Sequence, residues 1–320
     1  MKTVFILNPE AGKKNNLITL SESIKRAALD CGKDVEIYIT KAQGDATDFV
    51  RGKCEDGEHI RFIACGGDGT LSEVVCGAIG YDNAEIGVIP MGTGNDFCRN
   101  FSKDYDFASP EAQLCGDTVE CDAIKYTTEV DGKRVEGYCA NMFNIGFDCN
   151  VADLTGTIKK KTPLAGSLAY FAAILATLVR KKCTELEVFL DDKKAHDGKL
   201  LLTSLANGSF CGGGIMSNPG AAINDGLINV NIINNVSRLR FISLLPYYMK
   251  GTHGSLRGIE RVITTCGAQR VKIVPKDNKI RLCIDGEIID AGVTEFEVVH
   301  NAFHFVLPQV QKSEGILSAK

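Results

Sequence analysis

Hydrophobic positions in the first 120 residues of the chain follow two periods in turn. Short β-branched runs predict strands, and between them apolar residues recur at every third or fourth position, which is the pattern of an amphipathic helix. Strands separated by helices form parallel βαβ units, so this part of the sequence predicts a three-layer α/β domain. The predicted strands span residues 3–7, 35–40, 60–65 and 85–90.

The pattern changes after about Asp122. Strand-like runs separated by Gly, Asn and Asp follow one another, and only two helical stretches interrupt them, at about 163–182 and 238–250. Successive short strands with few crossover helices predict a β-rich, sandwich-like second domain. The expected domains are residues 1–124 and 125–299, with residues from about 300 to 320 returning to the first.

Composition narrows the class of protein. A length of 320 residues suits two domains, and a net charge of −4 argues against a nucleic-acid-binding protein. The thirteen cysteines include no Cys-x-x-Cys pair. Because the N-terminus also lacks an export-signal pattern, we expect reduced thiols in a cytoplasmic protein. The longest apolar stretch, residues 163–179, is shorter than the roughly 20 residues of a membrane-spanning helix, which favours a buried helix.

The segment Gly66-Gly67-Asp68-Gly69-Thr70 lies between the third predicted strand and the next helix. Ligands of open α/β sheets bind at the carboxyl ends of strands, and glycines let backbone N–H groups approach phosphate oxygens. The spacing matches neither the P-loop nor the Gly-x-Gly-x-x-Gly fingerprint. A tight turn with positive φ is the alternative, but it accounts for one or two glycines rather than three. The segment therefore predicts a phosphate site.

Two further polar turns follow predicted strands. Gly92-Thr93-Gly94-Asn95-Asp96 comes after the fourth strand, and Asn8-Pro9-x-x-Gly12 comes after the first. A helix cap at Asn95 or Asp96 would explain the first of these turns by itself. Because the carboxyl ends of parallel strands meet at one edge of a sheet, we expect all three glycine-containing turns to face one cleft.

Together with a later motif, Asp285-Gly286-Glu287, these turns resemble the diacylglycerol kinase catalytic domain family, which includes bacterial soluble lipid kinases and the sphingosine kinases. The resemblance implies an α/β domain of the NAD kinase/diacylglycerol kinase type that binds ATP and Mg²⁺, and a second domain that binds lipid. It also implies transfer of the γ-phosphoryl group of ATP to a lipid hydroxyl. Diacylglycerol, which would give phosphatidic acid, is the first expected acceptor, and a sphingoid base, phosphatidylglycerol or an undecaprenol-like lipid are alternatives.

The resemblance also assigns residues to roles. Asp68 would take part in catalysis and would join Asp96 and Asp122 in an acidic network that holds magnesium and water. For Asp122, the alternative is a solvated strand residue at the domain junction. The expected nucleotide-binding residues are Asn8, Pro9, Gly12, Thr40, Gly66, Gly67, Asp68, Gly69, Thr70, Glu73, Gly92, Thr93 and Asn95.

Two motifs of the second domain carry further expectations. Residues 212–230 resemble the family region in which an Asp and a nearby carbonyl, here Asp225 and Leu227, bind a structural magnesium ion. An ordinary Asp-Gly turn is the alternative. Asp285-Gly286 between apolar runs is by itself a hairpin signal, which leaves Glu287 unexplained. A hydroxyl-phosphorylating enzyme needs a carboxylate near the nucleophile, and the resemblance makes Glu287 the general base.

Two other functions stay open on the sequence. An NAD kinase shares Gly-Gly-Asp-Gly-Thr but is expected to lack the second glycine turn and the Asp-Gly-Glu motif. A nucleotide-binding regulatory protein without turnover would not need a general base.

For a lipid kinase we expect a peripheral position at the inner face of the membrane, where its substrate lies. Lys159-Lys160-Lys161 and Arg180-Lys181-Lys182 are candidate contacts with anionic lipid. A solvated helix end is the alternative explanation of each cluster. An edge strand of the β-rich domain would offer a route to a homodimer.

Overall fold

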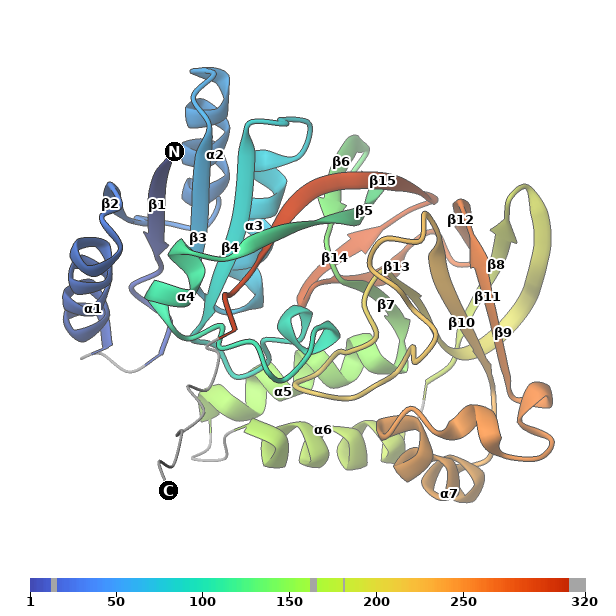
Figure 1. Ribbon diagram of the computed structural model, residues 1–320. Coiled ribbons are helices and arrows are strands. Elements are labelled where there is room, and N and C mark those ends of the chain that lie inside the picture. Colours follow the sequence, from blue (N-terminus) through green and yellow to red (C-terminus); the bar gives the residue numbers. More distant parts are fainter. Residues whose placement is uncertain (13–15, 162–165, 181, 311–320) are drawn as a thin grey trace, which may run out of the picture.

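The computed structural model describes residues 1–12, 16–161, 166–180 and 182–310. Its N-terminal half is the predicted α/β unit (Figure 1). Four strands run parallel in the order β2-β1-β3-β4. Alternate side chains of β1 enter two cores, one under α2 and α3 and the other under α1 and α4. The elements are β1 (Lys2–Leu7), α1 (Asn16–Cys31), β2 (Val35–Ile39), α2 (Asp45–Glu55), β3 (Ile60–Gly66), α3 (Asp68–Ala78), β4 (Ala84–Pro90), η1 (Phe97–Asn100) and α4 (Pro110–Leu114).

The C-terminal half is rich in strands, also as predicted. Its strands share one core, which includes Phe143 and Phe296. Helices α5, α6 and α7 pack on the outside of this sheet through a separate core that includes Leu202 and Phe241. The elements are β5 (Asp117–Val130), β6 (Lys133–Cys139), β7 (Met142–Gly146), α5 (Phe147–Lys161), α6 (Gly166–Arg180), β8 (Thr184–Leu190), β9 (Lys193–Ala206), β10 (Ile228–Asn234), α7 (Arg238–Met249), η2 (His253–Ser255), η3 (Ile259–Arg261), β11 (Ile263–Ala268), β12 (Arg270–Pro275), β13 (Ile280–Ile284), β14 (Glu287–Ala291) and β15 (Thr294–Leu307).

Two long strands, β5 and β15, join the halves into one hydrogen-bonded sheet. They pair antiparallel along their length, and β15 pairs with β12 near its start and in parallel with β4 at His304 and Phe305. The register of the two strands shifts between Val299 and Phe303, where Asn301 has φ 52°. The last strand therefore lies against the N-terminal sheet, while residues 311–320 of the predicted returning segment lie outside the described residues.

The helix α5 departs from the sequence prediction, which treated residues up to Phe147 as strand and expected no helix before about residue 163. Its residues include Thr155, Gly156 and Thr157, which are weak helix formers. Local helix propensity therefore does not predict α5. The two expected helices are present as α6 and α7. Among the described residues, no helix has both the length and the apolar character required to cross a membrane.

Candidate functional site

The two glycine-rich turns lie directly against each other. A Cβ at Gly67 would lie 3.3 Å from the Cα atom of Gly92, and a Cβ at Gly92 would lie 2.7 Å from the Cα atom of Gly67. Nothing lies within 4 Å of a Cβ built at Gly69, whose position faces open space. Some of these glycines are therefore required by turn-to-turn packing, whereas Gly69 leaves room for a ligand.

The Asp68 carboxylate ties the second turn to the first. Its Oδ2 accepts the N–H of Asn95 at 2.7 Å, and its Oδ1 accepts the N–H of Asp96 at 2.7 Å. The Asp96 carboxylate accepts the N–H of Gly213, from the C-terminal half, at 2.9 Å. Burial, together with the charge of Asp68, raises the pKa of Asp96 to about 6. Two acidic side chains from successive turns thus meet at the boundary of the two halves.

A wide cleft, here called the outer cleft, has a volume of about 1100 Å³. Asn8 closes one wall of it by donating its Nδ2 hydrogen to Thr70 Oγ1 at 3.0 Å. Glu287 reaches the cleft from the C-terminal half, and Gln43 Nε2 donates to Glu287 Oε1 at 2.7 Å. The predicted nucleotide-binding residues that line it are Asn8, Pro9, Gly12, Thr40, Gly67, Gly69, Thr70, Glu73, Gly92 and Thr93.

Three predicted nucleotide-binding residues support this wall without lining it. A Cβ at Gly66 would overlap the Thr70 side chain. Asn95 exchanges hydrogen bonds with Gly92 inside the second turn, and Asp68 lies on the far side of that turn, in a second cavity. The three glycine-containing turns therefore meet around one cleft, as the topology predicts.

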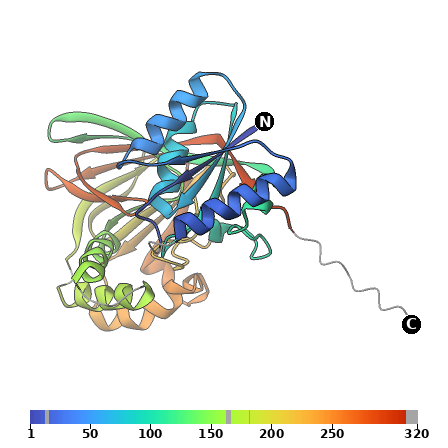
Figure 2. The same ribbon diagram turned by 90° about the vertical axis from the view of Figure 1, so that its left-hand side faces the viewer.

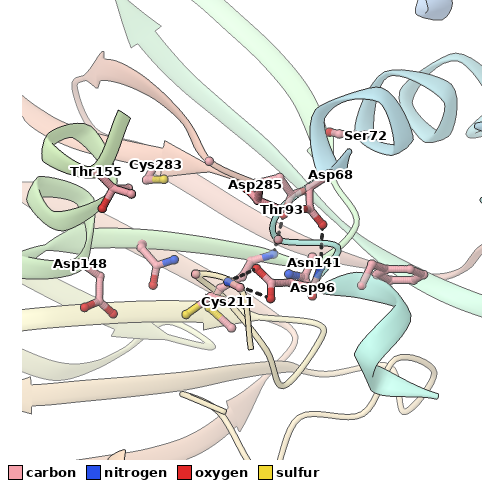
Figure 3. A pocket seen from close by; sticks show the side chains of 18 of the residues that line it. Asp68, Ser72, Thr93, Asp96, Asn141, Asp148, Thr155, Cys211, Cys283 and Asp285 are labelled. Carbon is pink, nitrogen blue, oxygen red and sulfur yellow. Dashed lines mark hydrogen bonds between the residues drawn. The ribbon is translucent and has the colours of Figure 1, made fainter. Parts of the chain in front are cut away.

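The second cavity, here called the acidic cavity, has a volume of about 300 Å³ and lies between the halves. Figure 3 shows Asp68, Asp96 and Asp285 gathered at one end and Asp148 with Thr155 at the other. None of the described residues that line it is Lys, Arg or His. The side-chain oxygen of Asn144, which also lines it, is buried and has no hydrogen-bond partner in the described part of the chain. The cavity is rich in hydrogen-bond acceptors and poor in positive charge.

The hairpin of Asp285 and Gly286 stands between the outer cleft and the acidic cavity. Both residues have positive φ, 44° and 99°, as the predicted two-residue hairpin requires. Met142 N–H donates to Asp285 Oδ1 at 2.9 Å, which fixes the hairpin to β7. Removal of the Asp285 carboxyl from water raises its pKa to about 6. Asp285 and Gly286 line the acidic cavity, and the next residue, Glu287, lines the outer cleft.

A narrow third cavity, here called the apolar cavity, lies between α6, α7 and the sheet. It has a volume of about 40 Å³, and Phe147, Ile174, Phe241 and Leu244 are among its lining residues. Asp148 lines both this cavity and the acidic cavity. Tyr248 donates its hydroxyl hydrogen to Asp148 Oδ2 at 3.2 Å. Burial raises the pKa of Asp148 to about 6.

Asp122 is not brought into the acidic group of Asp68 and Asp96. It is fully buried, and its carboxylate accepts the N–H groups of Gly226 and Asn301 and contacts His300 Nδ1. These contacts hold the shifted register of β15 in place. Asp122 lies at the domain junction, but it is buried and not the solvated strand residue of the alternative. Its place in a metal network stays a prediction from the resemblance.

The predicted ion site at Asp225 and Leu227 forms a local turn. Asp225 is exposed, and its Oδ1 accepts the Leu227 N–H at 3.0 Å. Among the described residues, no group of three His, Cys, Asp or Glu side chains is arranged to hold a metal ion. A structural ion at Asp225 stays a prediction from the resemblance.

Sequence reasoning missed three residues of the site: Gln43, Asn144 and Asp148. Gln43 lies in the loop after β2, and its contact with Glu287 spans 244 positions of the chain. Asn144 and Asp148 flank the junction of β7 with the overlooked helix α5. The sequence offered two signals: Asn144 is a polar residue within an apolar strand, and Asp148 is an acidic residue just after that strand.

Comparison with family models places the whole site within known domains. Residues 2–126 match the diacylglycerol kinase catalytic domain, and residues 141–307 match the YegS C-terminal NAD kinase beta sandwich-like domain. The diacylglycerol kinase of Bacillus subtilis is 28% identical over 316 residues, which cover 97% of each chain. A Xanthomonas euvesicatoria protein named probable lipid kinase YegS-like is 28% identical over 264 residues, 80% of this chain and 81% of its own.

Solved structures show the same fold. A diacylglycerol kinase from Bacillus anthracis superposes with a TM-score of 0.67 at 18% identity, covering 96% of each chain. Yeast NADH kinase superposes with a TM-score of 0.51 at 12% identity, covering 100% of this chain and 89% of its own. With both family models matched in order along the chain, the protein belongs to the diacylglycerol kinase catalytic domain family, in the branch that carries the YegS-type C-terminal domain.

Proposed function

We propose that the protein is an ATP-dependent lipid kinase that transfers the γ-phosphoryl group of ATP to a lipid hydroxyl, with diacylglycerol as acceptor and phosphatidic acid as product. The observation that carries this proposal is the hairpin tip between two cavities. Glu287 lines the outer cleft and its neighbour Gly286 lines the acidic cavity. A phosphoryl group delivered from one cavity could there meet a hydroxyl presented from the other.

The outer cleft suits the phosphates of ATP. The open space above Gly69 leaves room for phosphate oxygens beside the backbone. Gly69 lies in the first turn of α3, an 11-residue helix, and the free N–H groups of a helix N-terminus favour anions. The main chain of this turn therefore binds and orients the phosphates.

Asp68 and Asp96 fit the requirements of a magnesium site. They present carboxylate oxygens, which are the donors that Mg²⁺ prefers, at the edge of the phosphate turn. When bound, the ion supplies positive charge that offsets the negative charge of the transferring phosphoryl group. The backbone hydrogen bonds to Asp68 keep its two oxygens in a fixed orientation before any ligand arrives.

Glu287 is the proposed general base. Gln43 holds its carboxylate at the cleft, within reach of the tip of the Asp285 hairpin. As the acceptor oxygen bonds to the γ-phosphorus and the bond to ADP breaks, Glu287 takes the hydroxyl proton. Such a base contributes typically ~10²–10⁴-fold to the rate.

The acidic and apolar cavities together suit a lipid with a neutral head. Four Asp side chains line the acidic cavity, and Arg99, which pairs with Asp96 at 3.5 Å, lies outside that lining. The cavity therefore disfavours an anionic head such as that of phosphatidylglycerol. The free Asn144 oxygen and the Asp148 carboxylate accept hydrogen bonds, which a hydroxyl group can donate. The apolar cavity would receive an acyl chain, and its small volume requires α6 and α7 to separate as the chain enters.

Labelled ATP with a panel of acceptors tests the proposal. Diacylglycerol, a sphingoid base, phosphatidylglycerol, an undecaprenol and NAD are each incubated with enzyme and magnesium, and the products are identified by mass. The expected result is a phosphorylated neutral lipid, with diacylglycerol the preferred acceptor. Phosphorylation of NAD alone, or ATP binding without any phosphorylated product, would overturn it.

A further inference from the structure

Helices α6 and α7 present apolar side chains to solvent at one end of the molecule. The inner sides of the two helices share a core that includes Ile174 and Phe241. Their outer sides expose large apolar residues to different degrees, and Figures 1 and 2 both show the two helices together beneath the strands. The exposed residues are Leu175 (45%), Val179 (75%), Leu239 (82%), Ile242 (51%) and Tyr247 (44%), here called the α6–α7 face.

Arg238 joins the two helices into one surface. Its Nε donates to the carbonyl oxygen of Leu178 at 3.1 Å, and its Nη2 donates to that of Val179 at 3.1 Å. These carbonyls lie at the end of α6, where backbone acceptors have no partner within the helix. Arg238, the first residue of α7, therefore holds the end of α6 in place. The exposed side chains of the two helices are thus fixed relative to one another.

The charge of this region is opposite to that of the whole protein. Residues 162–183 and 235–259 contain seven Lys and Arg residues but no Asp or Glu, although the chain carries a net charge of −4. Arg240, Lys250 and Arg257 are exposed, and within the described part of the chain none of them forms an ion pair. Apolar side chains bordered by unpaired cations are the composition of surfaces that bind anionic lipid.

The α6–α7 face also covers the apolar cavity. Ile174 of α6 and Leu244 of α7 line that cavity, on helix sides that are turned away from Val179 and Ile242. Asp148 then connects the apolar cavity with the acidic cavity. A lipid leaving a bilayer beneath the two helices would pass between them to reach the reacting groups.

We propose that the α6–α7 face docks on the surface of an anionic bilayer, with Leu175, Val179, Leu239 and Ile242 inserted among the lipids and Arg240, Lys250 and Arg257 at the phosphate level. The functional role of this docking rests on the proposed lipid kinase function. A protein partner is less suited, because the exposed side chains project from two helices instead of lining a groove. The basic residues also find their complement in any anionic lipid.

Vesicle sedimentation without ATP tests the docking separately from catalysis. The probes are vesicles of phosphatidylcholine, with or without phosphatidylserine, neither of which is a candidate acceptor. The wild-type protein should sediment with the mixed vesicles and much less with pure phosphatidylcholine. Arg240→Glu should weaken binding to mixed vesicles at least about fivefold, the equivalent of ~1 kcal/mol per surface cation. Leu239→Asp with Ile242→Asp should weaken it about tenfold or more.

Matched controls lie on α1, at the other side of the molecule. Leu29 is 83% exposed, and Lys25 is exposed on the same helix. Leu29→Asp and Lys25→Glu introduce the same chemical changes and should leave vesicle binding at the wild-type level. Equal loss in the α1 and α7 variants, or no loss in the α7 variants, would overturn the proposal.

A water-soluble, short-chain diacylglycerol distinguishes docking from the proposed reaction. The α7 variants should phosphorylate it at the wild-type rate but lose activity on long-chain diacylglycerol in mixed vesicles. Loss on both substrates would contradict a role confined to docking. If no lipid is phosphorylated by the wild-type protein, the proposed function fails, and the sedimentation result still decides whether the face binds a bilayer.

Discussion

Gly69 is the residue of the first glycine-rich turn, Gly66 to Thr70, whose lack of a side chain the fold itself does not need. Nothing lies within 4 Å of a Cβ at this position, and its φ is not positive. Gly69→Val should therefore fold with an unchanged melting temperature, while its two methyl groups enter the space proposed for phosphate. We expect ATP affinity to fall at least about tenfold, or ~1.4 kcal/mol, by calorimetry. Unchanged affinity in a folded variant would remove the phosphate role of this turn.

Glu287→Gln tests the proposed proton transfer without disturbing the fold of the hairpin. Glutamine keeps the shape of the side chain and an oxygen that can accept from Gln43. The hairpin should stay folded, while lipid phosphorylation falls by ~10²–10⁴-fold. Because Glu287 lines the outer cleft, ATP affinity must be measured beside the rate, and we expect it to change far less than the rate. Turnover near the wild-type rate would show that Asp285-Gly286-Glu287 is only a turn.

Asp148 gives a prediction about pH. Burial raises its pKa to about 6 from the ordinary value of 3.8, so between those values the folded protein keeps a proton that the unfolded chain has lost. Stability therefore falls as pH rises through this window, and the loss is complete above it. Asp148→Asn, which stays neutral, should be more stable than wild type by about 2–3 kcal/mol near pH 8, with the difference closing near pH 4. Urea unfolding at both pH values measures it, and a pH-independent difference would contradict it.

At the scale of elements, the contact of the two glycine turns is tested by Gly92→Ala. Its Cβ would lie 2.7 Å from Gly67 Cα and 2.9 Å from Asn95 Oδ1, where the backbone has little freedom to yield. Displacement of the turn should cost about 1–3 kcal/mol of unfolding free energy, measured in urea. Gly69→Ala is the control, since its methyl group meets open space. Equal effects of the two substitutions would argue against a specific contact between the turns.

The elements of the site were predictable where their signal is local. The turns follow β-branched strands, and Asp285-Gly286 has the residue types of a two-residue hairpin, so periodicity and turn chemistry sufficed. α5 was missed because its Gly and Thr residues give weak helix propensity, and Asp148 was missed with it. Gln43 could not be found, because its partner Glu287 is brought near only by the tertiary fold.

At the scale of the whole molecule, hydrophobic periodicity identifies strands but does not show which strands pair with each other. The alternation of apolar residues identified β15 as a strand, but its contact with β4 joins residues more than 200 positions apart. The same limit applies to Asp122. Its sequence neighbourhood does not show that His300 and Asn301 would surround its carboxylate, and the resemblance assigned it to the metal network.

Asp122→Ala distinguishes the structural role from the metal role. It leaves the N–H groups of Gly226 and Asn301 without their acceptor at the junction of the halves. An unsatisfied buried donor costs about 1–3 kcal/mol, so we expect a loss of about 2 kcal/mol or more in one cooperative transition by calorimetry. The loss should be the same with and without magnesium. A loss that appears only with magnesium would return Asp122 to the acidic network.

The pair of long strands that crosses both halves has a mechanical consequence. β5 and β15 are each 14 residues long and stay paired on both sides of the shifted register. Rotating one half against the other would break several backbone hydrogen bonds together, so this pair of strands resists a hinge motion at the boundary. The pairing therefore restrains the separation between Asp68 and the Asp285 hairpin. For the proposed reaction, such a frame would align the reacting groups through its own rigidity instead of through closure of the two halves.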